Sequence, residues 1–420
     1  MIEESKIIRD PIHGNIKVED VFLDLIKAPE IQRLYNIKQL GFAHLVFPGA
    51  HHTRLEHSLG TYYLAYETAE KLGLDKDDKK LIACAAILHD IGHGPFSHTL
   101  ESLLRDSINV DHIDLTEELI YGKHTIFEHN EKEFIESPTV HEILDKHEMD
   151  HKKIVNLIRG TQVEDKKYLS QILNSAVDVD QLDYIIRDSY YTGVAYGIID
   201  IERFLQTLTL SEDTLAIRRK GIGVVENILL ARTLMYSSVY FHKTVRIAEL
   251  MLSKAIELAK EYEPFDFFKM TDAELIYNLK NKGSFQSEIA TRLKYRNLFK
   301  QAYAKSKSDV PIGNMDVIKK LEDIDFRRDK EEEFEKKLEI PKGHIIIDAP
   351  TKELHLSEPR IAQTDILVVD EEGKHRTLEE LTPIANAVKM REIPNWVVMI
   401  VTDEKYRALI AENAEKILFN

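Results

Sequence analysis

The sequence of 420 residues contains one cysteine and has no excess of basic side chains. With Cys84 as its one cysteine, the chain cannot form an intramolecular disulfide, which agrees with a reducing compartment. Asp and Glu outnumber Lys and Arg by 72 to 56, a formal charge of −16. Because proteins bind nucleic-acid backbones through many Lys and Arg contacts, this balance argues against a nucleic-acid partner.

Long apolar runs are also missing. The sequence shows neither a cleavable signal nor an apolar stretch long enough to span a bilayer, so we expect a soluble, cytoplasmic protein that does not contact a membrane. Its hydrophobic patterns are mostly those of helices, with a short hairpin at residues 7–18. We therefore predict a mainly α fold with small β-hairpins and a C-terminal α+β lobe.

Composition changes near residue 305 and divides the chain into three parts. We predict a helical core at 1–305, a charged helical linker at 306–340 and a small α+β lobe at 341–420. The linker is dense in charges of both signs, which is typical of an exposed helix. The lobe alternates short apolar runs with two helical patterns.

The densest group of chemically active side chains lies in residues 84–101, CAAILHDIGHGPFSHTLE. An apolar helical run ends there at His89 and Asp90, just before a Gly- and Pro-containing break. Burying such a pair costs on the order of several kcal/mol unless each group finds a partner, and a divalent cation satisfies both. A hydrogen-bonded structural couple is the alternative. Because His93 and His98 follow at once, we favour a metal-centred hydrolytic site.

Other segments must complete the ligand set, because adjacent helical residues cannot surround a cation. Upstream, Arg54 and His57 lie three residues apart and share one face of a predicted helix. Downstream, a helical pattern at 176–192 carries several carboxylates, among them Asp180. These three segments are our candidates for one site.

The pattern at 176–192 places chemically active groups on one face. At 100° per residue, Asp180, Tyr184 and Arg187 fall close together, with Asp188 beside them. The alternative for Arg187 is an ion pair with Asp183 that ties helices together.

A second predicted helix, at about 225–259, interleaves cations with aromatic rings. Its side chains at i, i+4, i+8 and i+11 share a face: Arg232, Tyr236, Tyr240 and Lys243. Such a face suits a triphosphate with a stacked nucleoside, although a solvated basic stripe would give the same pattern.

Taken together, these motifs resemble the HD-domain phosphohydrolase superfamily, whose ligand pattern is H…HD…D. The matching residues, in order, are His57, His89, Asp90 and Asp180. Six segments resemble the deoxynucleoside triphosphate triphosphohydrolase branch: DPIHGNIKV, IQRLYNIKQLG, VFPGAHHTRLEHSLG, LHDIGHGPFSH, VDVDQLDYIIRDSYYTG and VYFHKTVR. The resemblance implies an HD-domain helical core that hydrolyses a dNTP to a deoxynucleoside and inorganic triphosphate.

The resemblance also implies roles for individual residues. The four matching ligands would hold one divalent metal ion, with Fe, Mn, Zn and Mg not distinguishable by ligand type. His98, or His93, would protonate the departing 5′-oxygen, and Glu101 would hold His98 in its productive tautomer. His112 matches a further catalytic histidine, but Ile113 stands where the family usually has Glu.

For the substrate, the resemblance implies contacts with phosphates, sugar and base. We expect Arg54 to form a fork for phosphate oxygens. The resemblance places Arg232 and Lys243 against phosphates or a neighbouring nucleotide, Tyr240 against the nucleoside, and Gln39 and Leu40 beside the deoxyribose. The helical face described above adds Tyr184 and Asp188 as expected substrate contacts.

The family also suggests a homotetramer with a regulatory nucleotide between subunits. Here Asp10, Pro29, Gln32 and Arg33 match the segments that form that pocket, whereas Lys27 and Tyr35 replace the acid and the arginine that read guanine. An ammonium group can only donate hydrogen bonds, so we expect any activation not to be selective for guanine. Alternatives to the dNTPase reading are another HD-type phosphohydrolase, such as a phosphodiesterase or 5′-nucleotidase, and a nucleotide-sensing protein.

Overall fold

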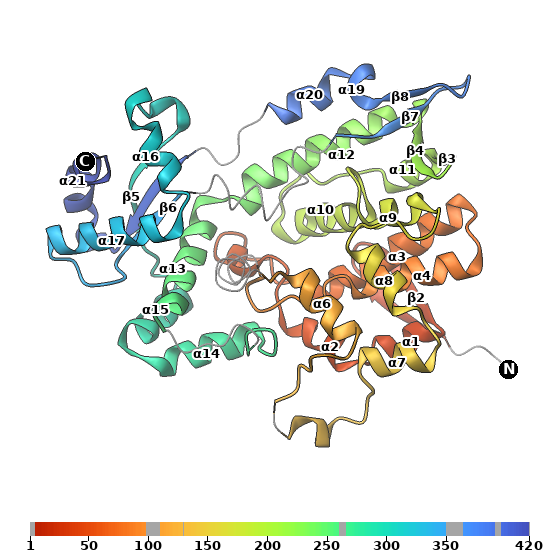
Figure 1. Ribbon diagram of the computed structural model, residues 1–420, viewed down its shortest axis with the longest axis horizontal. Coiled ribbons are helices and arrows are strands. Elements are labelled where there is room, and N and C mark those ends of the chain that lie inside the picture. The colour runs from red at the N-terminus through yellow and green to blue at the C-terminus, as the bar shows by residue number, and fades with distance from the viewer. Residues whose placement is uncertain are drawn as a thin grey trace.

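The computed structural model describes residues 5–97, 110–128, 130–259, 266–349, 364–390 and 396–419. Helices dominate it and the strands form small sheets, which confirms the mainly α prediction (Figure 1). Among the described helices, none has both the length and the apolar character needed to cross a membrane.

The chain begins with the predicted hairpin, formed by β1 (Ser5–Asp10) and β2 (Gly14–Glu19). The carboxylate of Asp10 accepts hydrogen bonds from the backbone nitrogens of Ile12 and His13, at 2.9 and 2.8 Å. An aspartate side chain that caps its own turn in this way stabilises a tight reversal.

Most of the first half of the chain is a helical core. Its helices are α1 (Val21–Leu25), α2 (Pro29–Arg33), α3 (Arg54–Leu72), α4 (Lys76–Leu88), α6 (His112–Ile120), α7 (Val140–Lys146), α8 (His151–Ile158), α9 (Lys167–Leu173), α10 (Val179–Thr192), α11 (Ile201–Thr207) and α12 (Ile222–Met235). Helix α3 starts at a capping box between Thr53 and Glu56. Helix α4 is buried from Ile82 to Leu88, so its carboxyl end delivers the next residue, His89, to the interior.

The predicted helix at 225–259 is interrupted. Helix α12 ends at Met235, a π-helical turn η5 spans Tyr236–Tyr240, and α13 runs over Lys243–Ala259. A π turn is wider than an α turn and shifts the register of the residues that follow. The prediction of one continuous face from Arg232 to Lys243 is therefore wrong.

The second half of the chain contributes most of a second and all of a third hydrophobic cluster, and its helices α13 to α17 lie on the left of Figure 1. Helix α13 packs there with α14 (Asp272–Lys282) and α15 (Ser284–Lys294). Next to them, β9 (Val398–Thr402) is the middle strand of an antiparallel sheet, between β5 (Lys300–Lys305) and β6 (Ile345–Asp348). The remaining helices of this part are α16 (Met315–Lys320), α17 (Ile324–Leu338) and α21 (Arg407–Leu418).

One C-terminal segment returns to the helical core. Strand β7 (Leu367–Val369) pairs in parallel with β4 (Thr214–Arg218), which extends the hairpin that β4 forms with β3 (Leu208–Ser211) (Figure 1). Strand β8 (His375–Thr377) completes this sheet, and α19 (Leu378–Leu381) and α20 (Pro383–Lys389) follow. Both sheets thus join segments that the predicted division at 305 and 340 separates.

Helices α3 and α10 approach closely at Gly60. A Cβ atom at Gly60 would lie 1.8 Å from Asp183 Oδ1 and 2.5 Å from Arg187 Nη2, and both of these side chains are fully buried. Any side chain larger than hydrogen would have to displace a buried ion pair.

We expect Gly60→Ala to lower the free energy of unfolding by at least about 1–3 kcal/mol, the usual range for overpacking a core. The matched control is Gly223→Ala in α12, where a Cβ atom meets nothing within 4 Å. That change should raise stability by about 0.4–1 kcal/mol, because alanine restricts the unfolded chain. Urea unfolding of both variants measures the difference, and equal midpoints would contradict the close approach.

Candidate metal centre and active site

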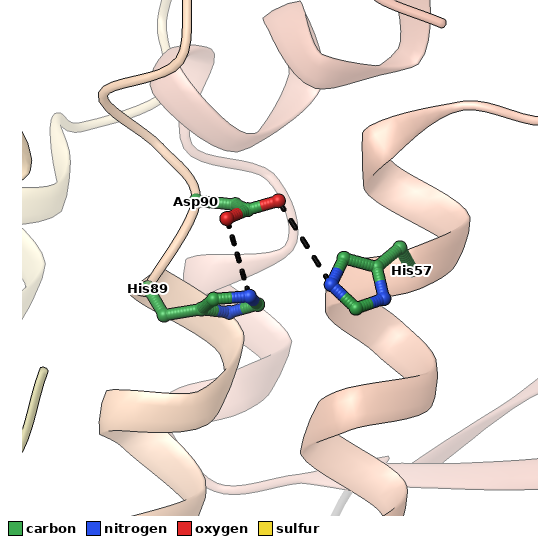
Figure 2. Close-up of side chains that lie close together, drawn as sticks. All are labelled: His57, His89 and Asp90. Carbon is green, nitrogen blue, oxygen red and sulfur yellow. Dashed lines mark ion pairs between the residues drawn. The ribbon is translucent and has the colours of Figure 1, made fainter. Parts of the chain in front are cut away.

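Two neighbouring helices bring together the first three predicted ligands. His57 lies in the first turn of α3, and His89 and Asp90 follow the carboxyl end of α4. Figure 2 shows Asp90 directed between the two imidazole rings. One ligand atom from each of these residues lies within 4.8 Å of the others, so the three side chains could share one cation.

Helix α10 adds the fourth predicted ligand from its first turn. Asp180 Oδ1 lies 3.1 Å from His57 Nε2 and 3.7 Å from His89 Nε2. On the other side, Asp90 Oδ1 lies 3.2 Å from His89 Nε2. The structure thus groups three of the predicted metal ligands and places the fourth, Asp180, beside the two histidines.

The protonation of His89 fits a metal ligand. Its Nδ1 lies 2.7 Å from the carbonyl oxygen of Ala86, which favours the tautomer with the proton on Nδ1. Its Nε2 is buried and has no hydrogen-bond partner in the described part of the chain. A buried nitrogen lone pair that faces two carboxylates is unfavourable by itself and is satisfied by a divalent cation.

A second carboxylate orients His57 from behind. Asp183 is fully buried, and its Oδ2 lies 2.8 Å from His57 Nδ1. The same oxygen accepts a hydrogen bond from Arg187 Nε at 2.9 Å, and Oδ1 lies 2.7 Å from His13 Nε2. Burial alone would raise the pKa of Asp183, but Arg187, His13 and His57 hold it well below its usual range. The sequence alternative of an Arg187–Asp183 pair is correct.

Sequence reasoning missed the contacts of Asp183 with His57 and His13. Two features of the sequence could have indicated these contacts. Asp183 follows Asp180 by three residues on the same helix, and the segment DPIHG contains His13.

Electrostatics keep the carboxylates of the site charged. Burial would raise the pKa of Asp90, but His89, Arg54 and His93 lower it well below its usual value. Burial would likewise lower the pKa of His57, yet hydrogen bonds with Asp180 and Asp183 raise it to about 10. The ionised, buried carboxylate of Asp90 gives a strong attraction for a cation.

The loop after Asp90 is held from two sides. Arg33 of α2 donates to the carbonyl oxygens of Ile91 and His93, at 2.9 and 2.7 Å. Gly92 packs against α6, where a Cβ atom would lie 2.2 Å from the carbonyl oxygen of His112. Only glycine therefore lets this loop pack so closely against α6.

These contacts place two predicted catalytic histidines beside the ligands. The rings of His93 and His112 stack with centroids 3.9 Å apart, and His93 Nε2 lies 3.3 Å from Asp90 Oδ1. Burial, followed by the charges of Arg54 and His112, lowers the pKa of His93 well below its usual value. The other two predicted catalytic residues, His98 and Glu101, lie outside the described residues.

Arg54 reaches the same point from the start of α3. Its Nη1 donates to Asp90 Oδ2 at 2.5 Å and its Nε donates to Ser97 Oγ at 2.9 Å. The guanidinium group is buried and puts one positive charge next to a candidate ligand.

Aromatic rings lie on another side of the candidate centre. The ring of Tyr184 lies 6.4 Å from that of His57 and 6.0 Å from that of Tyr240, nearly perpendicular to the latter. The hydroxyl of Tyr240 donates to Asp188 Oδ2 at 2.7 Å, and Asp188 Oδ1 lies 2.7 Å from His52 Nε2. The predicted substrate residues Tyr184, Asp188 and Tyr240 therefore form one group.

Four other predicted substrate residues have different surroundings. Arg232 is fully buried and donates to Ala176 O and Gln181 Oε1, at 2.8 and 2.7 Å, whereas Lys243 is exposed at the start of α13. Gln39 lies beside His52, with its backbone nitrogen 3.0 Å from His52 O, and its buried Oε1 has no hydrogen-bond partner among the described residues. Leu40 packs against two hydrophobic clusters.

Two protein families match the sequence, the HD domain over residues 54–188 and the HD associated region over residues 199–419. An uncharacterised protein of Methanocaldococcus jannaschii is 34% identical over 98% of this chain and 82% of that protein. The human deoxynucleoside triphosphate triphosphohydrolase SAMHD1 is 25% identical over 99% of this chain and 70% of that protein. Its Dictyostelium discoideum homologue is 29% identical, over 71% of this chain and 60% of that protein.

Solved structures of similar proteins agree with the fold. A hypothetical protein from Aquifex aeolicus superposes with a TM-score of 0.73 at 29% identity, covering 98% of this chain and 100% of that one. A phosphohydrolase from Bacteroides thetaiotaomicron has a TM-score of 0.71 at 26% identity and covers 96% of this chain and 100% of that one.

The contact between Asp183 and His57 yields a prediction. We expect Asp183→Asn to weaken binding of Mn²⁺ or Zn²⁺ at the candidate centre by about 10–100-fold, the usual effect of losing a group that orients a ligand. The control is Asp316→Asn in α16, where the aspartate is exposed. Titration against a chromogenic chelator measures affinity, and circular dichroism of the same samples detects unfolding. Unchanged affinity in a folded Asp183→Asn protein would contradict this role.

Proposed function

Because this chain belongs to the HD-domain phosphohydrolase family, we propose that it hydrolyses deoxynucleoside triphosphates to the deoxynucleoside and inorganic triphosphate. The convergence of His57, His89, Asp90 and Asp180 beside Arg54 is the observation that carries the proposal. The human and Dictyostelium relatives bear the name of this activity, which supports the choice of substrate.

The same four residues would hold one divalent ion, and their mixture of imidazoles and carboxylates suits Fe, Mn, Zn or Mg. When bound, such an ion supplies Lewis acidity at a phosphate oxygen and lowers the pKa of a bound water. The chain itself contributes the fixed orientation of the ligands, since Ala86 O and Asp183 hold the second nitrogens of His89 and His57.

The remaining catalytic roles concern proton transfer and phosphate binding. We assign proton delivery to the 5′-oxygen to His98, oriented by Glu101, because an alkoxide leaves poorly at neutral pH. His93 and His112, stacked on each other next to Asp90, are the alternative donors. Arg54 would offer its planar donors to phosphate oxygens beside the metal ligands.

For the nucleoside, the rings of Tyr184 and Tyr240 offer a stacking surface close to the ligands. Asp188 would keep Tyr240 in place through their hydrogen bond. Gln39 and Leu40 would border the deoxyribose, which agrees with the unpartnered Oε1 of Gln39 in the described structure. Lys243 remains a candidate phosphate contact, whereas the buried hydrogen bonds of Arg232 favour a structural role.

We further propose a cytoplasmic homotetramer with a regulatory nucleotide at a subunit interface. The resemblance of the segments around Asp10 and Arg33 to those of the eukaryotic enzymes supports this. Lys27 and Tyr35 are both exposed, with 51% of the Lys27 side chain accessible, so both could reach such a ligand.

Product analysis tests the proposed reaction. We expect anion-exchange chromatography to show inorganic triphosphate and deoxynucleoside from at least one dNTP in the presence of Mn²⁺ or Mg²⁺. The double variant His89→Ala, Asp90→Ala should lose both hydrolysis and the Mn²⁺ bound at this centre, because it removes two of the four proposed ligands, while the exposed control His375→Ala should retain both. Orthophosphate from a monophosphate would instead indicate a 5′-nucleotidase, and cleavage of a diester would indicate a phosphodiesterase.

A second prediction concerns activation. If a nucleotide stimulates hydrolysis of another dNTP, we expect GTP and dGTP to have no advantage, because Lys27 cannot accept the N1–H and N2–H of guanine. Each NTP and dNTP is titrated against a fixed second dNTP while light scattering follows oligomer size. Stimulation by guanine nucleotides alone, coupled to assembly, would show that this interpretation of Lys27 is wrong.

A further inference from the structure

A second group of metal-type ligands lies on the surface of the helical core, apart from the candidate active site. It consists of His141 and Asp145 on α7 and of His151, the first residue of α8, and we refer to these three residues as the α7–α8 cluster. One ligand atom from each lies within 4.8 Å of the others. No local sequence pattern separates these histidines from ordinary surface histidines.

The spacing in the α7–α8 cluster suits a metal ion better than hydrogen bonds. Asp145 Oδ2 lies 3.4 Å from His141 Nε2, and Asp145 Oδ1 lies 3.5 Å from His151 Nε2. Both separations exceed the usual length of a charge-assisted hydrogen bond, about 2.7–2.9 Å. Each separation, measured to a different oxygen of Asp145, is close to the edge of a tetrahedron with ligand bonds of about 2.0–2.1 Å, which is roughly 3.3 Å.

Both imidazoles are also oriented for this role. His141 Nδ1 lies 3.1 Å from the carbonyl oxygen of Ile120, which favours a proton on Nδ1 and leaves the Nε2 lone pair toward Asp145. The Nε2 atom of His151 is buried and has no hydrogen-bond partner among the described residues. In the candidate active site His89 shows both features in one ring, whereas here they are divided between His141 and His151.

An aromatic ring and charges of both signs border the α7–α8 cluster. Tyr121 stacks over His151, with ring centroids 6.3 Å apart and an angle of 23° between the planes. Burial, and after it the carboxylates of Glu117 and Asp150, raise the pKa of Tyr121. Because Arg159 donates to Glu117 at 2.6 Å, the negative charge within the cluster itself comes from Asp145.

We propose that His141, Asp145 and His151 bind a second divalent cation, of the Zn²⁺ type, with water completing the coordination. Two imidazoles and one carboxylate form a ligand set that zinc commonly takes, and the exposed side chain of Asp145 leaves the fourth position open to solvent. The site is independent of the proposed dNTP hydrolysis, because none of its ligands lies in the candidate active site.

A cation there would link three helices. It would join α7 to the start of α8, and the contact of His141 with Ile120 O connects both to the carboxyl end of α6. Helix α6 begins at His112, whose ring stacks on His93. The second ion would therefore fix the helix that carries a candidate catalytic histidine without touching the reacting atoms.

Metal stoichiometry tests the proposal. The full chain, free of any histidine tag, is stripped with chelator, loaded with Zn²⁺, desalted and analysed by mass spectrometry. To isolate the second site, the measurement uses the variant His89→Ala, Asp90→Ala as background. We expect this background to keep one equivalent of Zn²⁺ and to lose it when His141→Ala and His151→Ala are added, whereas adding His375→Ala should leave it unchanged.

Two further measurements cover unfolding and weak binding. Asp145→Asn replaces an exposed side chain, so it should keep the fold by circular dichroism and weaken Zn²⁺ binding at least 10-fold. In the same background, Co²⁺ should give the visible absorption of a four-coordinate site, which the His141 and His151 changes abolish. Retention of Zn²⁺ in a folded variant that lacks both histidines, or affinity only in the millimolar range for the background protein, would overturn the proposal.

Discussion

The buried carboxylate of Asp183 is the interaction on which the centre of this protein depends. It contacts His13 of the N-terminal turn, His57 of α3 and Arg187 of α10, and each of these groups is a donor or can become one. Burying a charge costs on the order of several kcal/mol unless such partners surround it. The hairpin, α3 and α10 are therefore held together by the same charge that fixes the orientation of a candidate metal ligand, so folding and site geometry cannot vary independently.

The segment from His89 to Ser97, after α4, depends on a similar arrangement. Arg33 holds the carbonyl oxygens of Ile91 and His93, and Asp272 of α14 accepts from the backbone nitrogen of Phe96 at 3.0 Å. Phe96 has a φ of 47°, a conformation that costs energy in a non-glycine residue and persists where its neighbours hold it. A displacement of α2 or α14 would thus move the segment that follows Asp90, because Arg33 and Asp272 are hydrogen-bonded to its backbone. This gives a physical route by which events at Arg33, in a segment that resembles an activator pocket, could change the candidate site.

The sequence was sufficient for those features that depend on local pattern and residue chemistry. The N-terminal hairpin, the apolar helix that ends at His89 and the helix that carries Asp180 all follow from periodicity and turn residues. Long-range pairing is different, because the parallel contact of β7 with β4 joins strands about 150 residues apart and leaves no local signal. The break at Tyr236–Tyr240 was missed for a related reason, since a π turn changes the register but not the composition.

The surroundings of each histidine also determine whether it could bind a metal ion. His52 Nε2 is satisfied by Asp188, and His44 Nδ1 lies 3.0 Å from Gly41 O, while no carboxylate of the described residues pairs with its other nitrogen. Contact with a backbone carbonyl is therefore not enough to identify a ligand. What distinguishes His89 and His141 is that the second nitrogen of each also faces a carboxylate, at 3.2 and 3.4 Å. In the neutral imidazole a proton on the first nitrogen leaves a lone pair on the second, and a divalent cation between that lone pair and the carboxylate can take the place of a second proton.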